Sequence, residues 1–352
     1  MSTGVVELGG VTPGRVAAAV RHATRARAVA VGGSAALVTL ALFCWSLSVG
    51  DFPVPVVDVV PAIFGRGEDR IPYIVQTLRL PRALTAVLVG GALGFSGAVF
   101  QSLARNPLAS PDMIGITQGA SASAVFVILV AGGGYYAVAT GALIGGLIAA
   151  AAIYVLAYRR GMSPYRLVLV GIGIGAMLQA VTNYLLTRVE IFEAARAVVW
   201  LTGSLNNRGW DHVRPVGYAM AVLVPALVLL ARGLRGLQLG DDAARGLGLP
   251  VERMRAGLVA VAVALAALST AAAGPITFVA LGAAPIGRRL TRAPLALVPA
   301  ALIGSALLLG SDLVAKRLFA PTELPVGVVT GVLGAPYLLY LLGRANSTGR
   351  GG

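Results

Sequence analysis

Hydrophobic residues gather along the chain in blocks of roughly 18–22 residues, the length that an α-helix rising about 1.5 Å per residue needs to cross about 30 Å of hydrocarbon. Polar or Gly/Pro-containing connections separate the blocks. The pattern predicts ten membrane-spanning helices, near residues 29–49, 82–101, 113–132, 136–157, 166–187, 213–231, 255–272, 275–290, 294–311 and 325–342. A nine-helix alternative joins the seventh and eighth blocks, because Ala273, Gly274 and Pro275 are the only break between them.

The composition also indicates a membrane protein. Hydrophobic residues make up 57% of the 352 residues, charged residues only 12%, and the mean hydropathy is +0.84. We therefore expect an all-α polytopic protein with one transmembrane domain at 29–343, between a cytoplasmic N-terminal segment at 1–28 and a cytoplasmic tail at 344–352. The first block is longer than the apolar part of a signal peptide and lacks a clear small-residue cleavage site, so we expect it to be a retained span.

The net charge of +14 comes from arginines that lie between the hydrophobic blocks. In a soluble protein this charge would suggest nucleic acid, but these arginines form no stripe with aromatic residues. Cytoplasmic loops of membrane proteins are enriched in Lys and Arg. Assigning alternate loops to the cytoplasm places eighteen of the 28 basic residues there, including Arg160 and Arg350, which predicts that both termini are cytoplasmic.

Several kinds of chemistry are excluded by the residues themselves. Cys44 is the only cysteine and His22 and His212 are the only histidines, so neither an intrachain disulfide nor a Cys/His metal cluster is expected. The P-loop of an ATPase needs a Gly-Lys-Ser/Thr sequence, but the only lysine, Lys316, follows Ala315. No predicted span contains a nucleophile with a base, or a pair of carboxylates. We therefore expect no enzyme activity and no cofactor in this chain.

Acidic residues are nearly confined to the predicted loops and span ends. Only Asp312 lies close to an apolar core, at its edge. Carriers driven by a proton or sodium gradient usually need ionisable groups within the membrane, so this class is disfavoured. A secondary carrier and a structural membrane scaffold remain alternatives to a transporter subunit that obtains its energy from a partner.

The segment from Leu78 to Ala120 is the most informative part of the sequence. A basic start with Arg79, Pro81 and Arg82 leads into a Gly-rich span, which ends in an Asn106-Pro107 turn. Gly90, Gly94 and Gly97 follow small-xxx-small spacing, which lets helices approach closely. By itself this spacing predicts helix packing and says nothing of transport.

The order R-x-P-R, G-x-x-L, S-G, Q, R-N-P-L-A-x-P and G-x-x-x-G-A in this segment resembles the FecCD/BtuC-type permeases, which serve ATP-driven importers of ferric siderophores, haem and vitamin B12. The resemblance extends over residues 35–343, through WLTGSLNNRGW at 200–210, LQLGDDAARGLGLP at 237–250, GPITFVALGAAPIGRRL at 274–290 and ELPVGVVTGVLGAPYLLYLL at 323–342. One departure is Ile286, which stands where many relatives have the histidine of Pro-His-x-x-Arg.

The resemblance implies a BtuC-like permease fold in the bacterial inner membrane. Two such permeases would form a pathway at their interface, two ATPases that bind ATP and Mg would dock inside, and a substrate-binding protein would dock outside. A ferric siderophore is the expected cargo, with cobalamin or haem as alternatives. The missing histidine favours a heterodimer of permeases over a homodimer.

The resemblance also assigns site residues in three groups. A coupling loop at 237–254, with acids in a first helical turn and a glycine stop, is expected to form a helix–turn–helix that contacts the ATPase; its candidates are Gly240, Asp241, Asp242, Ala244, Arg245, Gly248 and Pro250. Exposed cations are expected to dock the binding protein through its carboxylates; these are Arg79, Arg82 and Lys316. Gate and pathway candidates are Asn106, Leu108, Ser163, Pro164, Gln179 and Asn183.

The gate residues are expected to narrow the cytoplasmic exit, and the polar side chains of the fifth span to line the pathway, because such side chains are unfavourable against lipid. Gly171, Gly173 and Gly175 of this span serve either the lining or helix packing. Because release of a large cargo requires weak binding, no dedicated ligand pocket is expected.

Overall fold

The computed structural model describes residues 13–50, 52–67, 70–159, 161, 163–320 and 322–348. Residues 1–12 of the predicted N-terminal segment, residues 349–352 of the predicted tail and Arg160 lie outside the described residues.

The described residues form helices and no β-strand, as the hydrophobic pattern predicted. A helix coincides with each of the ten predicted blocks: α1 (Pro13–Ser48), α4 (Leu80–Ala104), α5 (Ile116–Leu129), α6 (Tyr135–Ala157), α7 (Pro164–Leu186), α9 (Trp210–Gln238), α11 (Val251–Ala273), α12 (Val279–Thr291), α13 (Leu297–Arg317) and α14 (Val326–Thr348). In the described part, seven helices are long and apolar enough to cross a membrane, and α5, α12 and α14 account for the other three blocks.

The nine-helix alternative is wrong, because a non-helical stretch separates α11 from α12. Gly274 has a φ of +75° and Phe278 a φ of +74°, both in the left-handed region that a continuing α-helix does not use. Gly274 ends α11, and a Cβ at this position would lie 2.8 Å from the carbonyl oxygen of Trp200. Only glycine therefore fits this turn.

Four shorter helices have no counterpart among the hydrophobic blocks: α2 (Val56–Ile63), α3 (Arg70–Tyr73), α8 (Ile191–Leu201) and α10 (Asp241–Gly246). A π-helical stretch, Ile74–Arg79, joins α3 to α4 in one continuous helix. Pro81 has no N–H to donate to the carbonyl four residues earlier, which accounts for the change of helix type just before it. The four short helices cannot span a membrane, so a search for hydrophobic blocks of membrane-spanning length does not find them.

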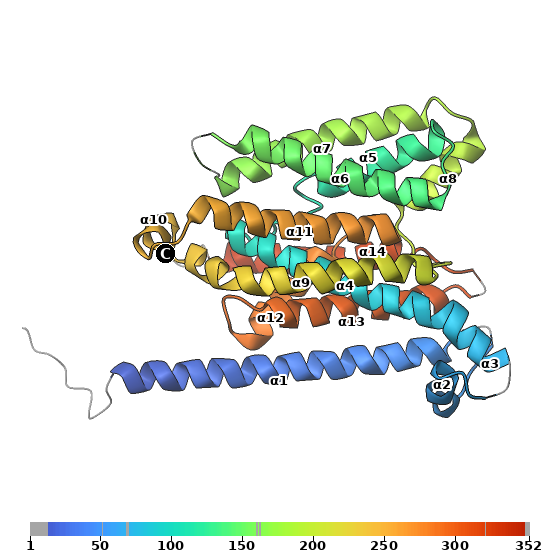
Figure 1. Ribbon diagram of the computed structural model, residues 1–352, viewed down its shortest axis with the longest axis horizontal. Coiled ribbons are helices and arrows are strands. Elements are labelled where there is room, and N and C mark those ends of the chain that lie inside the picture. The colour runs from blue at the N-terminus through green and yellow to red at the C-terminus, as the bar shows by residue number, and fades with distance from the viewer. Residues whose placement is uncertain are drawn as a thin grey trace, which may run out of the picture.

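The long helices run side by side along one axis of the molecule (Figure 1). Helices α5 to α8 form one group, α4, α9, α11 and α14 lie in the middle, and α12, α13 and then α1 follow on the other side. Helix α10 lies at one end of the bundle, here called the α10 end, and α2 and α3 lie at the opposite α2 end. Loops that the sequence assigned to opposite sides of a membrane thus lie at opposite ends of the bundle.

Helix α4 lies in the centre, where it contacts α9, α11, α12 and α13. Every residue from Val89 to Leu103 is buried. The predicted close approach through glycines is confirmed: a Cβ on Gly90 would lie 2.5 Å from the carbonyl oxygen of Gly304 in α13, and one on Gly94 or Gly97 would overlap a carbonyl of α13 or α12. These glycines set the distance between the central helix and its neighbours.

Gly94→Ala should destabilise the protein by about 1–3 kcal/mol, because the added methyl group forces α4 away from α13. The matched control is Gly33→Ala in α1, where a Cβ would meet nothing within 4 Å; this change should be neutral or stabilise by up to about 1 kcal/mol. Thermal unfolding of the detergent-purified protein, followed by tryptophan fluorescence, measures both. Equal midpoints for the two variants would contradict close packing at Gly94.

Candidate functional site

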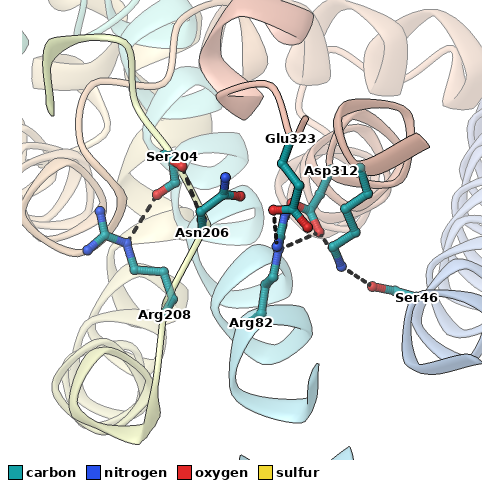
Figure 2. Close-up of polar contacts among 8 residues, drawn as sticks. Ser46, Arg82, Ser204, Asn206, Arg208, Asp312 and Glu323 are labelled. Atoms are coloured by element: carbon teal, nitrogen blue, oxygen red, sulfur yellow. Dashed lines mark hydrogen bonds and ion pairs between the residues drawn. The ribbon is translucent and has the colours of Figure 1, made fainter. Parts of the chain in front are cut away.

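A network of buried charges lies at the α2 end of the bundle (Figure 2). Arg82 of α4 donates three hydrogen bonds to Asp312 of α13, from Nη2 to Oδ1 at 2.9 Å and from Nε to Oδ1 at 3.1 Å and to Oδ2 at 3.2 Å. Its Nη1 atom donates to Oε2 of Glu323 at 2.8 Å. The side chain of Asp312 is 0% exposed, that of Arg82 11% and that of Glu323 38%. Glu323 is thus the one acid of this network that solvent reaches.

Lys316 completes the network from the next turn of α13. Its Nζ atom lies 2.9 Å from Oδ2 of Asp312 and donates to Ser46 of α1 at 3.3 Å. Arg79 is also buried, and its guanidinium donates to the main-chain carbonyls of Leu47, Ser48 and Phe52 around the end of α1.

The expectation that Arg79, Arg82 and Lys316 are exposed cations is therefore wrong. The physical reason is that a guanidinium or ammonium group at a helix end is stabilised by any carboxylate or carbonyl that the fold brings within reach. Asp312 and the end of α1 supply these groups within the same chain. Whether the three residues dock a binding protein stays a prediction.

The loop between α8 and α9 packs beside this network, also at the α2 end (Figure 2). Arg208 donates to the carbonyl of Ser204, whose hydroxyl accepts the N–H of Asn206 at 3.0 Å. The N–H of Ser204 donates to the carbonyl of Ala273 at 2.8 Å. The loop is thereby fixed to the turn that separates α11 from α12.

Helix α10 occupies the predicted coupling loop at the opposite end. Gly240 and Gly248, with φ values of +112° and +76°, flank it, and Asp241 and Asp242 lie in its first turn, where negative charge is favourable. Ala244 is fully buried, whereas Asp242 and Arg245 are exposed and pair with each other at 3.3 Å. The predicted coupling residues thus divide into an inward side that attaches the helix and an outward side that is free to contact a partner.

Arg255 of α11 holds the coupling helix to the body of the protein. Its Nη2 atom lies 2.8 Å from Oδ1 of Asp241, and its side chain is 5% exposed. The expected second short helix after Pro250 does not exist as a separate element, because α11 begins at Val251 and continues through the membrane. The coupling motif is therefore one short helix followed directly by a span.

The predicted gate residues lie near the α10 end, in the connection between α4 and α5 and at the start of α7. The side chain of Asn106 accepts the N–H of Leu108 at 2.9 Å, which makes a tight turn. Ser163 precedes α7, and its carbonyl accepts the N–H of Leu167 at 3.0 Å. Pro164 begins that helix, and its side chain lies outside the part of the chain that the structure describes. Further along the first connection, burial raises the pKa of the Asp112 carboxyl to about 6, and a hydrogen bond from Thr117 acts in the opposite direction.

Gln179 and Asn183 lie on an exposed face of α7, where Nε2 of Gln179 donates to Oδ1 of Asn183 at 3.1 Å. Two glycines of this helix serve helix packing, one of the two roles left open by the sequence. Gly171 packs against the carbonyl of Ile114 and Gly175 against Gly115, whereas a Cβ on Gly173 would meet nothing within 4 Å.

Sequence reasoning missed three residues that connect neighbouring elements within one end of the bundle or the other. Glu323, in the loop before α14, pairs with Arg82 of α4, and Arg255 of α11 pairs with Asp241 of α10. Arg105 at the end of α4 donates to the carbonyl of Leu237 at the end of α9. The i,i+4 spacing of Asp312 and Lys316 was a signal available in the sequence. The other pairings join residues far apart in the chain and leave no local signal.

A bundle of long apolar helices with buried ion pairs at one end and a short exposed helix at the other defines a polytopic membrane protein. In the described part, no group of His, Cys, Asp or Glu could hold a metal ion. The chain belongs to the FecCD transport family, whose model matches residues 38–344, and the predicted resemblance is confirmed.

Relatives with the same overall length support the assignment. The chain is 42% identical to the ferric enterobactin transport system permease protein FepG of Escherichia coli (strain K12), over 85% of this chain and 91% of that protein. It is 43% identical to the achromobactin transport system permease protein CbrC of Dickeya dadantii (strain 3937), over 88% and 89%. It is 37% identical to the iron(3+)-hydroxamate import system permease protein FhuG of Bacillus subtilis (strain 168), over 88% and 95%.

The fold is also similar to that of a solved transporter. With a TM-score of 0.80 and 26% identity, 89% of this chain matches 99% of a chain from an ABC transporter of the metal-chelate type in an inward-facing conformation. The fold is thus that of an ABC transporter permease.

Asp312→Asn should destabilise the protein by about 3–5 kcal/mol, because Arg82 and Lys316 would remain buried without their carboxylate. The control, Glu323→Gln, removes the partly exposed partner of the same arginine and should change stability by less than about 1 kcal/mol. The midpoint of thermal unfolding in detergent separates these outcomes. Equal midpoints would mean that burial of Asp312 contributes nothing to the network.

Proposed function

We propose that this chain is the membrane-spanning permease subunit of an ATP-driven, binding-protein-dependent importer of ferric siderophores, and that it forms half of the translocation pathway. The observation that carries the proposal is the match over residues 38–344 to the FecCD transport family, together with relatives named as permeases for ferric enterobactin, achromobactin and iron hydroxamate. Cobalamin or haem is the alternative cargo within the same family.

The other subunits of the proposed importer supply what this chain lacks. A partner ATPase would bind ATP and Mg on the cytoplasmic side, since the only lysine of this sequence does not stand in a Walker A motif. A second permease would complete the pathway, and Ile286 in place of the family's histidine favours a different chain over a second copy. An extracytoplasmic binding protein would deliver the cargo.

Charge and the position of α10 support an orientation in the bacterial inner membrane. We place the α10 end in the cytoplasm, with both termini, because most basic loops lie on that side. The coupling helix would then meet the ATPase, and the α2 end would meet the binding protein.

The exposed face of α7 that carries Gln179 and Asn183 is the proposed lining of the pathway. Gln179 and Asn183 pair with each other on a face that no other part of the described chain covers. A partner permease that faces this helix would enclose both side chains in the pathway, away from lipid. Asn106, Leu108 and the start of α7 at Ser163 and Pro164 would then narrow its cytoplasmic exit.

ATP-dependent uptake into proteoliposomes tests the proposal. Vesicles that hold this chain, its partner permease and the ATPase, with the binding protein added outside, should accumulate a radiolabelled ferric siderophore only when ATP is enclosed. Leu247→Asp, at an exposed leucine beside α10, should abolish copurification of the ATPase and uptake. Leu318→Asp, at a similarly exposed leucine of the α2 end, should retain the ATPase. Uptake driven by a proton gradient without ATP would favour a secondary carrier.

Docking of the binding protein at Arg82 requires that an incoming carboxylate replace Glu323, because Glu323, the partly exposed acid of the network, accepts from Nη1 of this guanidinium. Glu323→Gln should therefore strengthen association severalfold, while Asp312 still holds the arginine in place. Surface plasmon resonance of the binding protein on immobilised transporter measures the change. Thr322→Gln, at the preceding position, is the control for the introduction of a glutamine into this loop. An unchanged or weaker association of the Glu323 variant would argue against docking at Arg82.

A further inference from the structure

A polar cavity of about 450 Å³ opens at the α10 end, away from the network around Arg82. The end of α4, the end of α9 and the α12–α13 connection surround it. Two prolines and six polar residues form its lining, and the polar residues are Gln101, Ser102, Arg105, Asn106, Gln238 and Arg288.

The lining is rich in hydrogen-bond donors and contains no acid. Arg105 and Arg288 contribute two guanidinium groups, and Asn106 contributes an amide whose oxygen already accepts the N–H of Leu108. An adjacent cavity also touches Arg105, but there Asp241 neutralises Arg255. Within the described residues, the first cavity therefore offers positive charge that no acid of its lining compensates.

Arg288 is the central group of this cavity. Its Nη2 atom donates to Oε1 of Gln101 at 2.6 Å, and Gln101 in turn donates to the carbonyl of Leu281 at 3.0 Å, which fixes the guanidinium in place. Within the described residues no carboxylate pairs with Arg288, in contrast to the partly buried Arg82 and the buried Arg255. A guanidinium held by a neutral amide retains its donors for an oxyanion.

The position of the cavity indicates where such an oxyanion comes from. It lies at the α10 end of helices long enough to span a membrane, and this is the end that the proposed function places in the cytoplasm. Basic pockets between helices on the cytoplasmic side of a membrane suit the headgroups of anionic phospholipids.

We propose that the cavity around Arg105 and Arg288 is a binding site for the phosphate of an anionic phospholipid, phosphatidylglycerol or cardiolipin, of the cytoplasmic leaflet. Arg105 is followed by the proposed gate residue Asn106, and it donates to the carbonyl of Leu237, four residues before the first residue of α10. A bound phosphate would therefore stabilise the proposed exit loop and the start of α10 together. The site is a property of this chain alone and does not depend on its cargo.

Lipid retention measured on the full-length chain tests the proposal. The protein is placed in phosphatidylcholine nanodiscs with increasing fractions of phosphatidylglycerol. Native mass spectrometry measures the retained lipid, and thermal unfolding measures its stabilising effect. Arg288→Gln should weaken retention of phosphatidylglycerol at least tenfold and remove its stabilising effect. Arg288→Lys, which keeps the charge, should retain part of both effects and remains informative if the first variant folds poorly.

The matched control is Arg289→Gln, which removes an exposed arginine from the next position; this arginine donates instead to the hydroxyl of Tyr340. The control should bind phosphatidylglycerol as the wild type does. Equal lipid retention by the two Gln variants would overturn the proposal. So would inorganic phosphate that stabilises the wild type fully in phosphatidylcholine alone, because the ligand would then be a soluble anion. Loss of ATPase copurification in Arg288→Gln with unchanged lipid retention would assign the cavity to a protein partner instead.

Discussion

The close contact of α4 with α12 and α13 is the constraint on which the rest of this structure depends. Helices in a membrane gain little from hydrophobic association, so their packing depends on close contact between backbones. Gly90, Gly94 and Gly97 allow this contact along one helix. Because α4 is fixed in the centre, its two ends bring Arg82 to α13 on one side and Arg105 to α9 on the other.

Charges at the two ends are arranged differently, and the difference follows from this central helix. At the α2 end, Asp312 lies within reach of both Arg82 and Lys316, so two buried cations share one buried acid and the more exposed Glu323. At the α10 end, Asp241 pairs with Arg255, whereas Arg288 donates to the amide oxygen of Gln101 and, within the described residues, pairs with no carboxylate. The network at the α2 end is thus compensated by acids of the same chain, whereas the described residues supply no acid to Arg288.

This arrangement is consistent with the proposed permease subunit, which would transmit motion and take its energy from a partner ATPase. Helix α10 is attached through Ala244 and the Asp241–Arg255 pair and exposes its other side. The connection between α4 and α5 is joined to the end of α9, just before α10, by the hydrogen bond from Arg105 to the carbonyl of Leu237. The loop of Ser204 at the other end is fixed to the α11–α12 turn in a similar way.

The sequence by itself determined the fold class, the ten hydrophobic helices, the short helix α10 and the family, because hydrophobic length, capping residues and motif spacing are local properties of a chain. It also located the glycines of α4 as packing positions. Only the tertiary structure decided the break between α11 and α12, the helix start at Val251 and the burial of Arg79, Arg82 and Lys316. The reason is physical: a charge at a helix end is exposed or buried according to which partner the fold brings to it, and Asp312 lies 230 residues from Arg82 along the chain.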